Sequence, residues 1–357
     1  ARVALTGTPI ENHLGELFSI FEFLNPGFLG SKEEFLKNFN QPLQQASGRE
    51  AALARFRALV GPFMLRRLKD DKAIAPELPD KVEYEYMVEM TEEQSELYTA
   101  WIEKLLQKVP REGAVPDTTQ EPHEGKSSSS SRYWAIFTLL HRLQQVVNHP
   151  AAMPREHQLK AHSRDAYKSG KMTRLLELLH SIWENSQEKV LIFTQYRDTQ
   201  QLLAELLGKH FPGLRPLLFH GHLNSDQRQK AVDAFSGDAS SRVLILTLKA
   251  GGIGLNLTAA SHVIHFDRCW NPAKEAQATD RAHRIGQHHT VLVHRFTTMG
   301  SFEERLAQIV AGKKFLADSM SKNSGSGDIA QAISGLSDSQ LRQLFNLSNG
   351  LEVSGGA

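Results

Sequence analysis

Hydrophobic positions in the second half of the chain alternate between short continuous runs and longer stretches of helical spacing. The runs VLIFT, VLILT and VIHF are each followed by polar residues, which is typical of strands buried on both faces. The expected elements, in chain order, are helix 171–184, strand 190–196, helix 199–209, strand 216–219, helix 225–235, strands 243–248 and 262–267, helix 272–284, strand 291–296 and helix 301–317. This order predicts an α/β fold, a parallel sheet with helices on both faces.

The first half of the chain is dominated by helical spacing. Ser31 and Glu34 have the spacing of a capping box, and Thr91 and Gln94 repeat it. Helices are expected at 14–24, 32–39, 50–59, 92–108 and 133–148. Residues 2–6 predict a short buried strand. The alternation in 82–88 indicates a strand or an extended connector with one buried face.

Three segments interrupt this pattern. Residues 110–131 combine prolines and glycines with a five-serine run, which is the composition of a flexible loop. A second linker is expected at 151–169, and a serine- and glycine-rich linker at 321–327 precedes a last amphipathic helix at 337–347. The breaks therefore separate a helical region, a sheet-forming region and a tail.

Composition adds few constraints. With 357 residues and 40% hydrophobic content, the chain is long enough for two compact domains. Its 41 Lys and Arg residues nearly balance 40 Asp and Glu residues, so a nucleic-acid surface would have to form locally. The single cysteine, Cys269, excludes an intrachain disulfide framework and fits a reducing compartment. No signal peptide or bilayer-spanning run is recognisable, and a chain that opens at Ala1 within a strand-like run is expected to be a fragment of a longer protein.

Candidate chemistry lies directly after the predicted strands, because parallel sheets bind ligands beyond the carboxyl ends of their strands. The residues there are Gln195 and Tyr196, His220 and Gly221, Lys249 with Gly251, Gly252 and Gly254, and Arg268 with Trp270. Glycines let a backbone approach phosphate or sugar closely, and Thr247 and Lys249 add a hydroxyl and a cation. Taken alone, the glycine stretch is explained equally well by a tight turn without a ligand.

Arg281 and Arg284 are three residues apart, so on the predicted helix 272–284 they would project from one face. Two guanidinium groups in that position can converge on a γ-phosphate and stabilise the charge that develops during phosphoryl transfer, which is the role of an arginine finger. A solvated helical face is the alternative interpretation of the same spacing.

Other kinds of site find little support in the sequence. Histidines occur at His220, His222, His283, His288 and His289. No zinc-motif spacing joins them to carboxylates or cysteines, so no metal site is expected. A serine-nucleophile elbow is absent. The GKS tripeptide at 125–127 lacks the first glycine of a P-loop and lies in the loop 110–131, so it is not expected to bind ATP.

Together, several motifs resemble those of the SWI/SNF-type (sucrose-nonfermenting) ATPases, the double-stranded DNA translocases of helicase superfamily two. The matching segments are LTGTPIEN at 5–12, VLIFTQYRD, FHGHLNSDQRQKAVDAF, LTLKAGGIGLNLTAASHVIHFDRCWNP and QATDRAHRIGQ at 277–287, with FMLRR, NHP and SGKM between them. The resemblance covers about residues 1–320, and LSDSQLRQLF in the tail is similar to a prokaryotic branch.

The resemblance implies two RecA-like lobes that hold ATP between them and bind DNA across a shared face. Residues 1–13 would be the last strand and third motif of the first lobe, and 14–168 the helical protrusions and inter-lobe connector with the flexible loop 110–131. Residues 169–320 would form the second RecA-like lobe, and 321–357 a linker and C-terminal helix. The expected fold is thus a RecA-like α/β lobe with a helical protrusion region.

The resemblance also implies roles for individual residues. Arg281 and Arg284 would be the arginine fingers, and Gly252, Gly254 and Gln277 would lie near the nucleotide. The residues expected along the DNA are Gln195, His220, Gly221, Thr247, Lys249, Asn256 and Trp270. Thr6, Gly7 and Thr8 would couple the lobes.

One departure bears on activity, because the P-loop lysine and the magnesium-binding acids of the family are absent from this chain. ATP with Mg²⁺ would be bound mainly by the missing first lobe, so the chain alone should not hydrolyse ATP. The expected partner is double-stranded DNA, with a DNA-bound protein complex as a further candidate, no membrane, and a monomeric state. The expected location is the cytoplasm, associated with the nucleoid, in a prokaryote and the nucleus in a eukaryote. The alternatives are a non-catalytic nucleic-acid-binding or partner-docking module and an RNA-directed helicase.

Overall fold

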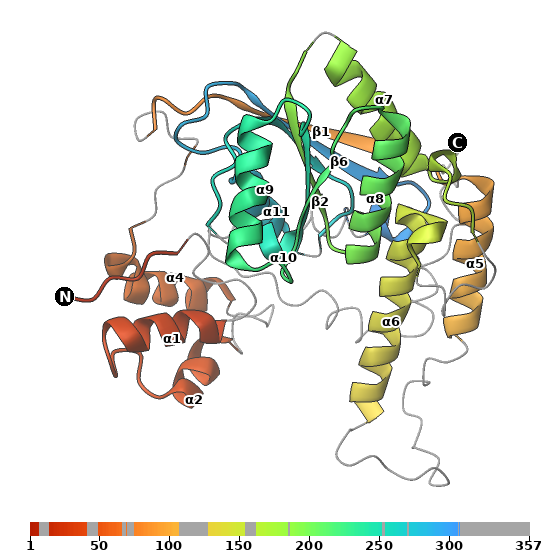
Figure 1. Cartoon of the computed structure of the whole chain (residues 1–357). Helices are drawn as coiled ribbons and strands as arrows, with labels where there is room; N and C mark the ends of the chain where they lie inside the picture. Colours follow the sequence, from red (N-terminus) through yellow and green to blue (C-terminus); the bar gives the residue numbers. More distant parts are fainter. Residues whose placement is uncertain are drawn as a thin grey trace, which may run out of the picture. The chain divides into compact units, whose positions relative to one another are not determined.

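The computed structural model describes residues 1–6, 14–40, 49–65, 69, 75–106, 128–153, 162–184, 186–251, 254–269, 271–305 and 307. They belong to two compact units, Ala1–Leu78 and Pro79–Ile309. The first unit is helical, and the second contains the sheet (Figure 1). Of the predicted flexible loop 110–131, residues 110–127 lie outside the described residues, and residues 128–131 are helical because α6 (Ser128–Asn148) begins at Ser128, so the loop was predicted too long. The predicted tail helix 337–347 also lies outside the described residues.

The first unit is a small helical bundle built on phenylalanine packing. Its elements are α1 (Leu14–Leu24), α2 (Lys32–Phe35), the π-helical η1 (Leu36–Asn40), α4 (Arg49–Val60) and the 3₁₀ turn η2 (Gly61–Phe63). Phe18, Phe21, Phe35 and Phe56 lie in its core. The predicted capping box of α2 is confirmed, since the Ser31 side chain accepts a hydrogen bond from the Glu34 backbone and the Glu34 carboxylate accepts one from the Ser31 backbone.

The buried strand predicted at 2–6 is wrong. Residues 1–6 have no regular structure, and Val3 and Leu5 are 74% and 94% exposed. A buried strand needs neighbouring strands to pair with its N–H and C=O groups, and the described part of this unit contains no other strand.

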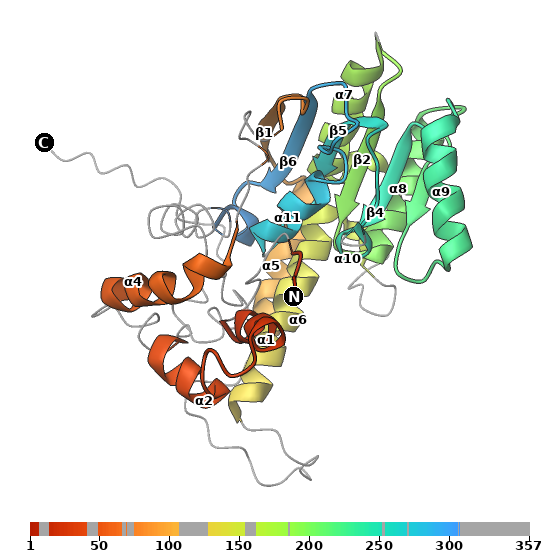
Figure 2. The same ribbon diagram turned by 90° about the vertical axis from the view of Figure 1, so that its left-hand side faces the viewer.

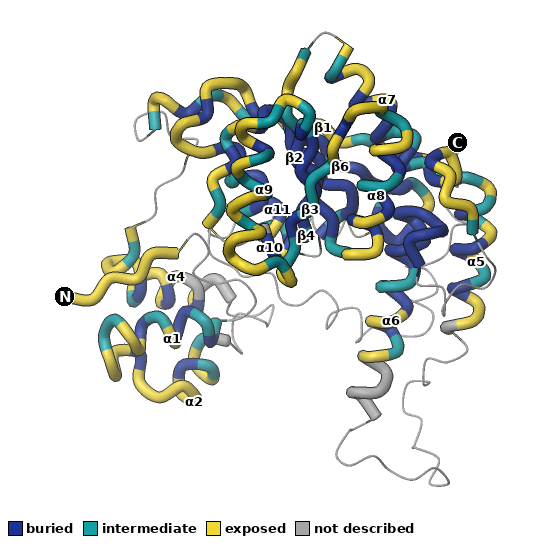
Figure 3. The backbone as a smooth tube through the Cα atoms, viewed as in Figure 1, coloured by how far each residue is buried: buried dark blue, intermediate teal, exposed yellow. Residues whose placement is uncertain are grey.

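The second unit is organised around a six-stranded sheet in which all pairs are parallel. The strands, in spatial order, are β1 (Lys81–Val88), β6 (Val291–Thr298), β5 (Ala260–His265), β2 (Lys189–Thr194), β4 (Val243–Thr247) and β3 (Leu217–Phe219). The predicted parallel α/β fold is confirmed. In β2, β4 and β5 nearly every residue is buried, as the continuous apolar runs predict (Figure 3).

Helices cover both faces of this sheet (Figures 1 and 2). α7 (Gly170–Glu184) and α8 (Arg197–His210) bury their leucines in one core with Val190 and Ile245. α9 (Ser225–Gly237), α10 (Leu248–Gly251) and α11 (Pro272–Thr279) pack on the opposite face, where Phe235 and Ala278 meet Leu244. Two longer helices, α5 (Glu92–Leu106) and α6 (Ser128–Asn148), lie side by side in the same unit, followed by the 3₁₀ turns η3 (Pro150–Ala152) and η5 (Ala166–Lys168).

Segment 82–88, for which the sequence left a strand or a connector open, is the edge strand β1. Its expected buried face is only partly present, since Val82 and Tyr84 are 38% and 44% exposed while Val88 is buried. An edge strand has a neighbour on one side only. Tyr84 and Tyr86 stack on His294 of β6, which covers part of their rings.

The predicted helix 272–284 is too long, because α11 ends at Thr279. The cap residue Asp280 donates its N–H to Ala276 and Ala278, which tightens the last turn, and the buried side chains of His265 and Thr279 are 2.9 Å apart. Arg281 and Arg284 therefore lie in the turns after the helix. Likewise, part of the predicted glycine loop is helical, since Lys249 and Ala250 belong to α10.

Candidate functional site

The strand order brings together the segments after β5, β2, β4 and β3, which are neighbours in the sheet. Their carboxyl ends therefore place Gln195, His220, Thr247 and Lys249 along one edge, as expected for a parallel sheet. Lys249 is exposed and Thr247 is half-buried. Of the predicted site residues, Gly7, Thr8, Gly252 and Trp270 lie outside the described residues, and Thr6 is exposed in the first unit.

Two segments that lead into the amino ends of β5 and β6 are joined by hydrogen bonds, the glycine segment (residues 254–260) and the arginine segment (residues 280–289). Leu257 donates its backbone N–H to the carbonyl of Arg281 at 3.0 Å, and a terminal nitrogen of Arg284 donates to the carbonyl of Leu255 at 3.2 Å. These bonds run between the backbone next to Gly254 and the two arginines. The Arg284 guanidinium and the Arg281 backbone therefore lie against the segment that begins at the exposed Gly254.

Gln287 fixes the arginine segment from within. Its buried side-chain nitrogen donates to the carbonyls of Ala260, Thr258 and Ala282 at 2.8, 3.1 and 3.3 Å. Its side-chain oxygen accepts the N–H groups of the next two residues at 2.9 and 3.0 Å. Sequence reasoning missed this residue, although it closes the motif QATDRAHRIGQ.

The arginine segment is electrically suited to an anion. Burial and the charge of Arg284 lower the pKa of Arg281 below its usual value, while Asp280 raises it. The first two effects show that Arg281 is partly desolvated and that the two cations lie close enough to repel each other. A bound phosphate would relieve that repulsion and accept hydrogen bonds from both side chains. Gln277 lies half-buried on α11, one turn before Arg281.

The carboxyl edge of the sheet is also basic, near His220. Burial first, then the charges of Arg197, His222 and Arg228, lower the pKa of His220. Within the described part of the chain, the buried Nδ1 of His220 has no hydrogen-bond partner. Arg228 holds the turn by donating to the carbonyl of Gly221 at 2.8 Å. Arg197 and Arg228, which sequence reasoning did not select, thus add positive charge beside two predicted DNA residues.

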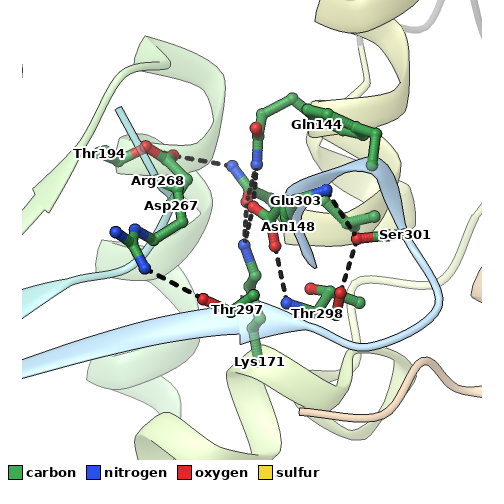
Figure 4. A network of polar contacts seen from close by, with 12 residues as sticks. Gln144, Asn148, Lys171, Thr194, Asp267, Arg268, Thr297, Thr298, Ser301 and Glu303 are labelled. Carbon is green, nitrogen blue, oxygen red and sulfur yellow. Dashed lines mark hydrogen bonds and ion pairs between the residues drawn. The ribbon is translucent and has the colours of Figure 1, made fainter. Parts of the chain in front are cut away.

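A buried polar network supports the ends of β2 and β5 (Figure 4). Asp267 accepts hydrogen bonds from the Thr194 hydroxyl at 2.5 Å, from the Gln195 backbone at 2.9 Å and from the Asn148 side chain at 2.9 Å. The Gln195 side chain in turn donates to the carbonyl of Arg268 at 2.8 Å. Burial raises the pKa of Asp267 to about 6, against the opposing effects of Lys171 and these hydrogen bonds. The network therefore sets the position of Gln195 and of the segment that follows β5.

The same network contains an ion pair without solvent access. Lys171 Nζ lies 2.5 Å from Glu303 Oε1 and 3.2 Å from Asn148 Oδ1, and both charged side chains are fully buried. Glu303 also accepts hydrogen bonds from the side chain of Gln144 and from the backbone of Thr298. Asn148 and Lys171 belong to the NHP and SGKM motifs, and Thr194 and Asp267 to VLIFTQYRD and LTLKAGGIGLNLTAASHVIHFDRCWNP, and these motifs were the sequence signals for this network. Spacing within the sequence could not reveal it.

Other chemistries find little support in the described residues. No group of three or more histidines, cysteines and carboxylates is arranged to hold a metal ion within the ranges that the structure covers. Burial raises the pKa of the Cys269 thiol to about 12, so it stays protonated at neutral pH. None of the described helices is both long and apolar enough to cross a bilayer.

Comparison with known proteins gives a consistent result. Residues 1–152 match the SNF2-related domain, and residues 170–286 match the helicase conserved C-terminal domain. The chain is 39% identical over 347 residues to the Bacillus subtilis protein YwqA, whose name describes an ATP-dependent helicase/translocase. That match covers 97% of this chain and 34% of YwqA, so the chain spans about a third of this relative.

Solved structures with the same architecture come from Sulfolobus solfataricus. The SWI2/SNF2 ATPase core domain is 36% identical with a TM-score of 0.60, and the match covers 98% of this chain and 65% of that one. The SWI2/SNF2 ATPase core in complex with double-stranded DNA is 35% identical with a TM-score of 0.59, and the match covers 98% of this chain and 67% of that one.

Proposed function

Because this chain belongs to the SWI2/SNF2 ATPase family, we propose that it is the C-terminal part of an ATP-driven translocase on double-stranded DNA. In this role it remodels or displaces proteins bound to the DNA. Its own contributions are a pair of arginine fingers and one side of the DNA-binding surface. The observation that carries the proposal is the pairing of the glycine segment with the arginine segment, which brings the Arg284 guanidinium and the Arg281 backbone beside the segment that begins at the exposed Gly254.

The residues present fit the phosphates of ATP better than its metal ion. Arg281 and Arg284 provide planar, multidentate donors, and Gly254 has no atoms near the place where a side chain would begin. The described residues offer no cluster of carboxylates and histidines for Mg²⁺. Bound ATP would supply the γ-phosphoryl group for transfer to water. The part of this chain is to orient that group and stabilise its charge, and the Mg²⁺ ligands belong to a preceding lobe.

The DNA surface in this proposal follows the carboxyl edge of the sheet. Lys249, Thr247 and His220 lie there, with Gln195 held in place by Asp267. Contacts of cations, hydroxyls and backbone N–H groups with phosphates position a protein on DNA without reading its sequence. We therefore propose double-stranded DNA of any sequence as the substrate along which the protein moves.

The test uses the full-length protein that contains this chain, assayed for ATP hydrolysis with and without duplex DNA. Arg281→Ala or Arg284→Ala should lower kcat about a hundred- to a thousandfold, because each removes donors that act on developing charge, while duplex binding changes little. Arg215→Ala is the matched control, an exposed arginine before the amino end of β3, and should leave turnover unchanged.

Normal turnover in either variant would refute the finger assignment. Stimulation by duplex RNA in place of duplex DNA would refute the assignment of the polymer. Duplex binding without any DNA-stimulated turnover by the unaltered full-length protein would instead favour a non-catalytic binding module.

A further inference from the structure

The edge strand β1 pairs with β6 through its backbone ladder. In addition, β1 and the residue just before it are joined to the arginine segment and to α11 by contacts that involve side chains. These contacts form what we call the β1 clasp. On one side, its members are Pro79, which precedes β1, and Glu83 and Glu85 on β1. On the other side they are Arg268, Glu275, His283 and Arg295. The ladder itself pairs β1 with β6 along its whole length, from Lys81 opposite Val291 to Val88 opposite Thr298.

The first contact of the clasp is made by His283, which stands between Arg281 and Arg284 in the sequence. His283 Nε2 is 2.8 Å from the carbonyl oxygen of Pro79, and the His283 side chain is buried. A carbonyl oxygen can only accept a hydrogen bond, so Nε2 carries a proton and donates. The backbone N–H of His283 is bound to the carbonyl of Thr279, the last residue of α11. One side chain therefore joins the start of β1 to the turn that carries the arginines.

Pro79 lies at the boundary between the two compact units. It is the first residue of the second compact unit, so the backbone that leaves the first unit at Leu78 enters the second unit there. The next residue, Asp80, uses its carbonyl to accept the N–H of Val291 at 3.0 Å. Two successive carbonyls of the arriving chain are thus bound, one to the sheet and one to the arginine segment.

The second contact ties β1 to α11 through a shared carboxylate. Glu275 is buried, and its Oε1 accepts hydrogen bonds from the Cys269 backbone at 2.6 Å and from Arg268 Nε at 3.3 Å. Its Oε2 lies 3.4 Å from Arg295 Nε. Each of these arginines extends its other nitrogens to β1, Arg268 to Glu85 at 2.5 Å and Arg295 to Glu83 at 2.7 Å.

The ion pair of Glu83 with Arg295 in this bridge is charged at neutral pH. The hydrogen bond from Arg295 is the main cause that lowers the pKa of Glu83 to about 2, against the opposing effect of burial. This ion pair therefore persists across the physiological range, and Glu275 in the first turn of α11 is joined to β1 through Arg268 and Arg295.

From this geometry we infer that the β1 clasp sets the position of the arginine pair, with His283 as its central positioning residue. The strand that receives the chain from the first unit would thereby fix the arginines relative to itself. This inference rests on the proposed role of Arg281 and Arg284. The ladder alone already holds β1 on the sheet, whereas the clasp is directed at α11 and the arginine segment.

The experiment compares His283→Phe with His283→Gln in the full-length protein. Phe removes the donor to Pro79 and keeps a planar, buried ring, while the side-chain amide of Gln can donate to the same carbonyl. We expect His283→Phe to lower the kcat of DNA-stimulated ATP hydrolysis about tenfold, with the KM for ATP and the Kd for duplex DNA within twofold of the unaltered protein. His283→Gln should restore kcat to within about threefold.

A second readout does not depend on activity. Hydrogen exchange of a peptide covering residues 280–289, measured on this chain, should be about tenfold faster in His283→Phe and close to normal in His283→Gln. Unchanged turnover and exchange in His283→Phe, or equal defects in both variants, would overturn the inference. If His283→Phe does not fold, Glu83→Gln combined with Glu85→Gln decides the matter, since both carboxylates are at the strand surface and kcat should fall about threefold. Unchanged turnover of that double variant would also overturn it.

The parallel result for Arg281→Ala separates the two proposals. If Arg281→Ala retains turnover, the proposed function is wrong. If Arg281→Ala loses turnover while His283→Phe keeps it, only the clasp inference is wrong.

Discussion

Lys171→Met tests the buried polar network most directly, because it removes one charge of an ion pair that has no solvent access. Methionine has nearly the same length as lysine and fills the space, so the main loss is electrostatic. Glu303 would then have two remaining hydrogen bonds, from Gln144 and from the Thr298 backbone, and no cation beside it. Leaving such a charge buried and uncompensated costs about 3–5 kcal/mol. For a unit of this size that corresponds to a fall in Tm of about 6–20 °C.

The assay is urea unfolding followed by tryptophan fluorescence. All four tryptophans, Trp101, Trp134, Trp183 and Trp270, belong to the second unit, so the signal reports that unit alone. The double variant Lys171→Met with Glu303→Gln removes both charges and keeps the acceptor for Thr298. It should be less destabilised than Lys171→Met by at least about 1 kcal/mol, and together with the single variant Glu303→Gln it completes a double-mutant cycle that measures the coupling between the two side chains.

The matched control is Lys209→Met. Lys209 forms an ion pair with Glu205 at 2.6 Å, but its side chain is 62% exposed, so the loss should stay below about 1 kcal/mol. If Lys171→Met costs no more than Lys209→Met, or if the effects of Lys171→Met and Glu303→Gln are simply additive, the reasoning about buried charge is refuted.

Two further predictions concern single residues of the same unit. A side chain at Gly170 would begin 1.9 Å from the carbonyl oxygen of Glu89, so Gly170→Ala should cost about 3 kcal/mol or more in urea unfolding. Gly208→Ala, on α8 with nothing within 4 Å, should be neutral or stabilising by up to about 1 kcal/mol, and equal effects would contradict the packing argument. Burial lowers the pKa of His265 to about 4 from 6.5, so the stability that this residue contributes is complete above pH 6.5 and falls as the pH drops through the window from 6.5 to 4. About 1 kcal/mol should be lost between pH 7.5 and 5.5, and a His265→Gln variant with the same pH slope as the unaltered chain would show that another group is responsible.

Local patterns in the sequence predicted most elements of the second unit. Strands β2, β4 and β5 are buried on both faces, so apolar residues occupy successive positions and the strands appear in the sequence as continuous apolar runs. Helix starts were visible where a side chain binds its own backbone, as at Ser31, where the capping interactions span only three residues. The parallel order of the sheet followed from the alternation of strands and helices.

The errors arose where contacts between distant residues decide the structure. Residues 2–6 have the composition of a buried strand, but no described strand of their unit pairs with them. The apolar spacing of 272–284 continues beyond Thr279, yet the contact of Thr279 with His265 and the bonds of Gln287 turn the chain there. The choice of the two arginines as a catalytic pair stays a prediction, and their proximity comes from turns and not from the helical face that the sequence predicted.

The sequence by itself determined the class of fold, the candidate residues after the strands and the resemblance carried by the motifs, because these depend on spacing along the chain. Only the tertiary structure decided which polar residues are buried together. Lys171 and Glu303 are separated by 132 positions and Asn148 and Asp267 by 119, and each looks like a surface residue in its own segment. Their charges and amides are tolerable in the interior only because folding supplies a partner for each, and no local pattern records such a partner. The contact of His283 with Pro79 could not be predicted from the sequence either, because the two residues are 204 positions apart and only the fold brings them together.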